Sequence, residues 1–428
     1  MSTTSLPEGW HIPITQWLAV QFITGTTIAF TAATSPLRNA AAILAFATAY
    51  SVQLSAATYL PGTRFGAPIV AMCWVNVLNA IDLLVLSRAS YEAQREYDSA
   101  KTSNGKPKSA PPQPPRNPGL IQRYIWSLSL TFNYRRINTP WQIPALTPFH
   151  SHSPARIPSR THFLATSCIK LLFSIAIIHL FTIETEDLYL AHAISHLPTH
   201  PGEILFPFLY PHRTGTGSWE RDLVLRALFT LSFGIVARAT IVAGYTLASM
   251  VFVGTGLQEV SMWPPVAGGI KEGWSVRRFW GKTWHQTLRA LLVSNADFLS
   301  AILHIPVSLH LPFRFLFCFT VSGVVHLLMD VGFGVSIRES GALWFFVLQV
   351  GGIFAELLVG RVVGVDLGLG NGNGKGGMGW VRKGVGFVWV GGFMLWTVPV
   401  WVNPILVRLF KDGVRMMSPF LGFKGWEL

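Results

Sequence analysis

Two histidines are the residues of this sequence best placed to do chemistry. His285 lies near the end of a basic and aromatic stretch, S-V-R-R-F-W-G-K-T-W-H-Q, which runs from Ser275 to Gln286. His326 follows 41 positions later, inside an apolar run, Phe315 to Met329, that with its flanks is long enough to cross a bilayer. Because an ionisable group at membrane depth is costly, its presence indicates a functional site. The pair suggests acyl transfer at a buried site.

The neighbours of His326 on its helix fit the role of a general base. Ser322 and Gly323 precede it by four and three positions, and small residues there leave room for a substrate or a neighbouring helix. Asp330, four positions later, is expected to accept a hydrogen bond from the imidazole and fix its tautomer. The alternative is a neutral histidine satisfied by a helix carbonyl, which intramembrane histidines often are.

The stretch around His285 has two interpretations if Ser275 to Arg289 is one helix. Its two faces are then apolar and basic, formed by Trp280, Trp284, Leu288 and Leu291 on one side and by Arg278, Lys282, His285 and Arg289 on the other. One interpretation is an interfacial helix with a tryptophan belt and snorkelling cations. The other is that the basic face receives the phosphates of coenzyme A while His285 points into a reaction chamber.

Other motifs carry weaker signals. The glycines Gly372, Gly374 and Gly377 match G-x-G-x-x-G without the strand-turn-helix context that gives this pattern its meaning, so a flexible loop is expected. His192, His196 and His200 have helical spacing, but Pro198 interrupts the helix before the third ligand, and no metal site is expected. The three cysteines lie in apolar runs and form no disulfide framework or zinc-ligand spacing.

Composition indicates an integral membrane protein. Half of the 428 residues are hydrophobic and only 12% are charged, about half the share of an ordinary soluble domain, and the mean hydropathy is +0.41. The net charge of +13 could suggest nucleic acid, but the basic residues lie between apolar runs and not along one soluble face. Anionic lipid headgroups and phosphorylated cosubstrates are the better partners, and no nucleic acid is expected.

Nine apolar runs are close to the roughly 20 residues that a helix needs to cross the hydrocarbon core. They are Ile14 to Ala33, Leu37 to Ala56, Ala67 to Leu86, His162 to Ile183, Leu223 to Val253, Ala290 to Leu309, Leu311 to Met329, Ala342 to Gly360 and Gly384 to Val407. The run that begins at Leu223 is longer than one crossing, and the run that begins at Ala290 is polar enough to be a re-entrant element. The sequence predicts an all-α polytopic protein with about eight or nine transmembrane helices around an intramembrane reaction chamber.

The chain divides into three expected parts. Residues 1–87 form N-terminal transmembrane helices, and residues 88–160 form a loop with eleven Lys/Arg against three acids, which the positive-inside rule places in the cytosol. The middle of this loop, Lys101 to Pro118, is rich in proline and is expected to be disordered. Residues 161–428 form the catalytic region.

Three motifs resemble the wax synthase-like branch of the membrane-bound O-acyltransferase superfamily, in particular its fungal members that acetylate terpenoid and meroterpenoid alcohols. The first, R-R-I-N-T-P-W-Q from Arg135 to Gln142, is similar to that group's R-G-I-G-T-P-W-Q. The second joins W-P-P-V-A-G, Trp263 to Gly268, to the stretch that holds His285, and the third is S-G-V-V-H, which ends at His326.

This sequence departs from the family pattern at four positions. Arg136 and Asn138 replace glycines in the first motif, and Val266 and Ala267 stand where the family has Leu-Phe. A side chain smaller than Phe at Ala267 is expected to widen or reshape a pocket.

The resemblance implies the chemistry and the site. His326 would be the general base on an acceptor hydroxyl that attacks the thioester of an acyl-CoA directly, with Asp330 beside it. His285, with Trp284, would hold or polarise the reacting groups and help to stabilise the oxyanion. The donor-binding candidates are Arg277, Arg278, Lys282, Trp280 and Trp284.

The expected cosubstrate is acetyl-CoA, with no bound cofactor, and the expected acceptor is a terpenoid-like alcohol from the bilayer. The expected location is the endoplasmic reticulum membrane. A long-chain wax-ester or sterol acyltransferase is the alternative enzyme. A transporter is the alternative outside enzymes, although no internal repeat in hydropathy is present.

Overall fold

The computed structural model describes residues 8–60, 66–103, 119–150, 153–181, 194, 196–210, 219–363 and 379–411. Within these ranges the long elements are α-helices, and seven of them are long and apolar enough to cross a membrane. They are α2 (Leu37–Tyr59), α3 (Gly66–Ile81) with the π-helical turn η1 (Asp82–Leu86), α6 (Arg160–Leu180), α9 (Trp219–Gly254), α12 (His310–Gly332), α13 (Ala342–Val363) and α14 (Gly379–Lys411). The predicted class, an all-α polytopic membrane protein, is confirmed.

Two of the nine predicted crossings are not among these seven. Helix α1 (His11–Phe30) forms where it was predicted, but with its threonines and glutamines it is not among the helices that are long and apolar enough to cross. Helix α11 (Arg289–Ile302) has 14 residues and is about 21 Å long at 1.5 Å per residue, too short for a hydrocarbon core of about 30 Å. The run from Ala290 to Leu309 therefore contains a short helix and is not one full crossing, as its polar residues indicated.

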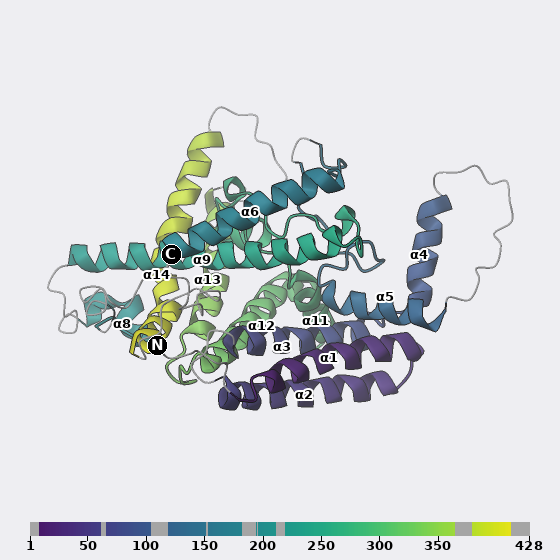
Figure 1. The fold of residues 1–428 in the computed structure, drawn as a ribbon. Coiled ribbons are helices and arrows are strands. Elements are labelled where there is room, and N and C mark those ends of the chain that lie inside the picture. Colours follow the sequence, from purple (N-terminus) through teal and green to yellow (C-terminus); the bar gives the residue numbers. More distant parts are fainter. Residues whose placement is uncertain are drawn as a thin grey trace.

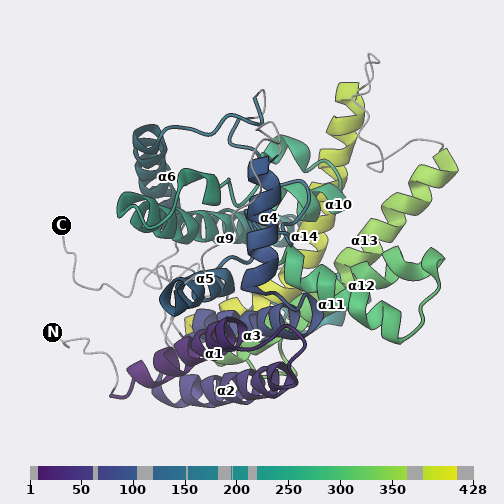
Figure 2. The ribbon, with the colours of Figure 1, turned by 90° about the vertical axis from the view of Figure 1, so that its right-hand side faces the viewer.

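The helices form two layers with a central group between them. Figure 1 shows α1, α2 and α3 in the lower layer, with α5 (Leu120–Phe132) against α1, and α6 lying along α9 in the upper part. Helices α11, α12 and α13 lie between these layers, and α14 packs against α9 and α13 (Figure 2). Helix α12 also contacts α3, so it joins the central group to the lower layer.

The buried apolar contacts explain why α12 is central. One cluster of the described residues holds Phe229 of α9, Phe345 of α13 and Trp401 of α14, with Leu327 and Met329 of α12 against it. A second cluster fills the space among α1, α2, α3 and α5, and a third, smaller one joins α3, α11 and α12. The residues near the middle of α12 are thereby fixed from both sides.

The outward faces of these helices are apolar, as lipid contact requires. Ile43 of α2, Ile169 and Leu172 of α6 and Val224 of α9 are each more than 60% exposed. A helix that is apolar all round is buried in a large core or spans a membrane, and exposure excludes the first case here. The chain is a multi-pass membrane protein.

The predicted basic loop, residues 88–160, contains two helices in its described part. Helix α4 (Tyr91–Ser103) is polar, whereas α5 packs against α1. Beyond Ser103, the proline-rich stretch lies outside the described residues, as do the glycine-rich motif and His192. His200 caps the short helix α8 (Pro201–Leu205) by accepting from the N–H of Gly202.

Candidate active site

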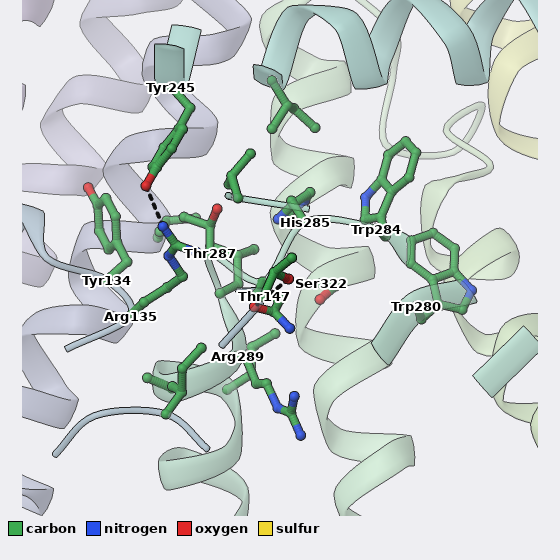
Figure 3. A pocket seen from close by; sticks show the side chains of 18 of the residues that line it. Tyr134, Arg135, Thr147, Tyr245, Trp280, Trp284, His285, Thr287, Arg289 and Ser322 are labelled. Carbon is green, nitrogen blue, oxygen red and sulfur yellow. Dashed lines mark hydrogen bonds between the residues drawn. The ribbon is translucent and has the colours of Figure 1, made fainter. Parts of the chain in front are cut away.

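A cavity of about 2510 Å³ lies between the lower layer and α9, and its wall includes residues of α3, α5, α9, α11 and α12. Ordinary ligand pockets have about 300 to 1,000 Å³, so this space is large enough for two substrates. Both predicted histidines line it. In Figure 3 Tyr134, Arg135 and Tyr245 lie on one side of the cavity, Trp280 and Trp284 on the other, and His285 between them.

His326 is held by its own helix and by two aromatic rings. Its Nδ1 lies 2.7 Å from the carbonyl oxygen of Ser322, and because a carbonyl only accepts, Nδ1 carries the proton. Phe346 and Trp401 pack on the imidazole at centroid distances of 4.6 and 4.9 Å. No described group bonds to Nε2, so the lone pair on that nitrogen is available in the cavity. The helix carbonyl that could have made His326 inert instead selects the tautomer in which Nε2 is unprotonated.

The predicted hydrogen bond between His326 and Asp330 is absent. Asp330 is fully buried and accepts from the Ser340 hydroxyl at 2.6 Å and from Trp401 Nε1 at 3.1 Å. Helical side chains point back toward the N-terminus, so the imidazole reaches Ser322 one turn earlier and not Asp330 one turn later. Among the described contacts, Asp330 is connected to the imidazole only through Trp401, which donates to Asp330 and packs its ring on His326.

Ser275 to Arg289 is not one helix, so the two-faced arrangement considered for it does not form. Helix α10 (Val276–Arg278) passes into a π-helical turn, η5 (Phe279–Thr283), and Trp284 is extended, with ψ of 175°. The chain then pairs antiparallel with the W-P-P-V-A-G segment, so that Ala267 lies opposite His285. The N–H groups of Gly268 and Gln286 donate to Lys282 and Val266 at 3.0 and 2.9 Å. This pairing uses backbone groups that a helix would need for itself.

His285 is positioned by its backbone and leaves its ring available. Its Nδ1 is buried and has no hydrogen-bond partner among the described residues. Burial, with a smaller contribution from His326, lowers the pKa of His285 to about 4, so the imidazole is neutral at pH 7. A neutral imidazole can donate a hydrogen bond to a carbonyl oxygen, and it does so best where water is excluded.

Trp280 and Trp284 form an aromatic wall beside His285, as Figure 3 shows. The indole N–H of Trp280 donates to Gln349 at 3.1 Å, so this side chain offers its ring to the cavity and not its polar atom. The ring of Trp284 lies 6.0 Å from that of His285. Both tryptophans line the cavity, as predicted for the donor site.

The three predicted cations also line the cavity, but they are not equivalent. Arg278 forms an ion pair with Glu272, and the guanidinium of Arg278 lies 4.7 Å from the centroid of the Trp274 ring. The carboxylate of Glu272 also lies 3.9 Å from Lys282 Nζ. Arg277 has a buried guanidinium nitrogen, Nη1, without a partner among the described residues. Arg277 therefore offers a buried donor that is not committed to a described residue, whereas Arg278 is already paired with Glu272.

Arg135 begins the first motif, R-R-I-N-T-P-W-Q, and the sequence alone predicts no role for it. Its guanidinium donates to the carbonyls of Pro264 and Pro265 at 2.6 and 2.8 Å and to the Tyr245 hydroxyl, the bond dashed in Figure 3. Tyr245 in turn donates to Pro264 at 2.7 Å. Adjacent prolines have carbonyls but no N–H groups, so a W-P-P segment needs donors from elsewhere, and this was the signal in the sequence. The first and second motifs are thus bonded to each other.

The two replaced glycines of the first motif lie at positions with left-handed backbone. Arg136 and Asn138 have φ of 55° and 58°, a region that glycine occupies without strain. The strain at Arg136 and the burial of its charge are offset by an ion pair with Asp82 at 2.6 Å and a hydrogen bond to Asn79 at 2.8 Å. The expected effect of Ala267 on the pocket is not supported, because Val266 and not Ala267 lines the described cavity.

The fold and the site together define a membrane-embedded enzyme. Two histidines line its described cavity, and Arg277, Arg278 and Lys282 lie in the wall of the same cavity. The model of the membrane bound O-acyl transferase family matches residues 263–348, which include His285 and His326. No solved structure matches the chain.

Curated relatives extend this match over most of the chain. The acetyltransferase aurG of Calcarisporium arbuscula is 27% identical over 350 residues, 77% of each chain. The acetyltransferase fsoF of Humicola fuscoatra is 28% identical over 352 residues, 78% of this chain and 81% of its own. The acetyltransferase ataH of Aspergillus terreus is 32% identical over 197 residues, 44% of this chain and 61% of its own. Residues 263–348 are thus similar to the membrane bound O-acyl transferase family, and the chain is an acyltransferase that uses an acyl-CoA.

Proposed function

We propose that the chain transfers an acetyl group from acetyl-CoA to a hydroxyl of a terpenoid or meroterpenoid alcohol, in the endoplasmic reticulum membrane. The observation that carries this proposal is the position of His326 Nε2, without a partner among the described residues, in the cavity that His285 also lines. The acetyl donor is supported by the relatives, which are named acetyltransferases.

The reaction needs no acyl-enzyme. His326 Nε2 takes the proton of the acceptor hydroxyl as its oxygen attacks the thioester carbonyl carbon. The carbonyl oxygen becomes an oxyanion, which neutral His285 stabilises by donating a hydrogen bond. The carbon–sulfur bond then breaks, the ester is released, and the thiolate of coenzyme A recovers the proton from His326. Orientation in a water-poor chamber favours the alcohol over water as the nucleophile.

The cationic edge of the cavity is proposed to bind the phosphates of the donor. Arg278→Ala is expected to raise the KM for acetyl-CoA by about tenfold, since hydrogen bonds to charged groups contribute about 1.5 to 3 kcal/mol. It also leaves Glu272 without its main cation, which adds repulsion. Lys282→Ala, at a half-exposed position, should give a smaller rise. Steady-state kinetics with each substrate varied in turn measures both effects.

The control for these variants is Arg123→Ala, which removes an ion-paired arginine of α5 that lies away from the cavity. It should leave the KM for acetyl-CoA unchanged. If Arg278→Ala alters only the amount of protein in the membrane, Arg278 is an interfacial anchor and not a donor contact.

Donor competition tests the acetyl preference directly. Membranes that contain the protein are incubated with a panel of terpenoid alcohols and equal concentrations of acetyl-CoA and palmitoyl-CoA, and the esters are separated by mass. Acetyl esters are expected to dominate, because the relatives are acetyltransferases. A majority of palmitoyl esters would establish the long-chain alternative.

A further inference from the structure

Arg238 is a charged residue in the middle of α9, a helix that is long enough to span the membrane. A cation at such a position is costly and persists where it has specific partners. Its neighbours Ala237 and Thr240 line the described cavity, but Arg238 does not. Its guanidinium points to another element, and its partners explain why it is there.

Both partners of Arg238 are backbone carbonyls next to the paired segments of the site. Nη1 donates to Thr283 at 2.6 Å, and Nη2 donates to Gly268 at 2.8 Å. Thr283 ends the π-helical turn two residues before His285, and Gly268 follows Ala267, the residue opposite His285. One planar guanidinium thus joins the two chains at the point where they pair, a geometry that its forked donors suit.

His285 depends on this backbone because its ring has no bond that fixes it. Its Nδ1 is unpartnered among the described residues, and the pairing consists of two N–H···O bonds and a single bridge. So short a pairing is weak without support. Arg135 supplies that support at Pro264 and Pro265, and Arg238 supplies it at the other end of the segment.

We propose that Arg238 is a positioning residue that fixes the segment carrying His285 by joining the carbonyls of Thr283 and Gly268. This inference rests on the proposed role of His285. It assigns a role in the reaction to a residue of α9 that is not part of the described cavity wall and does not belong to any of the three motifs.

The first test is Arg238→Lys in the full-length protein in detergent. Lysine keeps the charge but cannot bond to two carbonyls as a planar fork. The kcat is expected to fall by about tenfold to a hundredfold, because small misplacements of a reacting group are that costly. The KM for acetyl-CoA should change by less than about twofold. If the lysine variant does not accumulate, Arg238→Gln, whose amide also donates, replaces it.

Arg226→Lys is the matched control. Arg226 lies on the same helix and also donates to a backbone carbonyl, that of Ile204 at 3.0 Å, but away from the cavity. It should leave kcat within about twofold of the wild type. An equal loss in both variants would mean that the arginines of α9 only maintain the fold, and would overturn the proposal.

A double-mutant cycle with His285→Ala separates this inference from the proposed mechanism. If Arg238 acts through His285, Arg238→Lys costs less than about twofold in kcat once His285 is alanine. The same fold loss in both backgrounds overturns the role of Arg238 and leaves that of His285 intact. A wild-type kcat in His285→Ala alone overturns both.

Discussion

His326→Ala is expected to lower the rate of acyl transfer by about a hundredfold to ten-thousandfold, the usual loss when a general base is removed. The protein should still accumulate in membranes, because the imidazole makes its one polar bond within its own helix, to Ser322. Initial rates of ester formation with purified protein measure the effect.

The structure provides a matched control on the same helix. His310 also bonds to a backbone carbonyl, that of Ile305 at 2.8 Å, but it is not part of the described cavity wall. His310→Ala should keep the wild-type rate. Asp330→Asn should cost less than His326→Ala, since Asp330 reaches the imidazole only through Trp401. Near-wild-type turnover in purified His326→Ala would exclude this residue as the base.

Asp82→Ala is expected to lower the free energy of unfolding by about 3 to 5 kcal/mol, the usual cost of leaving one charge of a buried pair without its partner. Asp82 and Arg136 are both almost fully buried, and the pair is reinforced by Asn79. Unfolding in mixed micelles with a rising fraction of sodium dodecyl sulfate measures the loss.

The double variant Asp82→Ala with Arg136→Gly should recover most of this stability. It removes both charges, and glycine relieves the strain at a φ of 55°. The pair of exposed Glu92 with partly buried Arg123 serves as control, since Glu92→Ala should cost less than about 1 kcal/mol. A double variant less stable than Asp82→Ala would show that Arg136 contributes through contacts other than this pair.

The features that depend on local pattern could be predicted from the sequence. Apolar runs of sufficient length located the seven spanning helices, and the cost of an ionisable group at membrane depth directed attention to His326. The polar residues after Ala290 indicated an element other than a full crossing, and α11 is too short for one. Each of these inferences concerns residues within a few turns of one another.

The features that depend on distant partners could not be predicted. Helical spacing suggested one helix through His285, but a segment about 18 positions earlier supplies the pairing that ends it at Thr283. The spacing of His326 and Asp330 suggested a hydrogen bond, but the donors to Asp330 are Ser340 and Trp401, 10 and 71 positions away. Arg238 lies within a long apolar span, and its two carbonyl partners come from segments that only the fold brings beside α9.

The left-handed backbone at Arg136 has a consequence for how this sequence could have arisen. A lineage that changes glycine to arginine at position 136 without a carboxylate at position 82 buries a lone cation on a strained residue, and one that gains Asp82 first buries a lone anion. Either order passes through a less stable ancestor. The two positions are therefore expected to be inherited together, with glycine at one accompanied by an uncharged residue at the other.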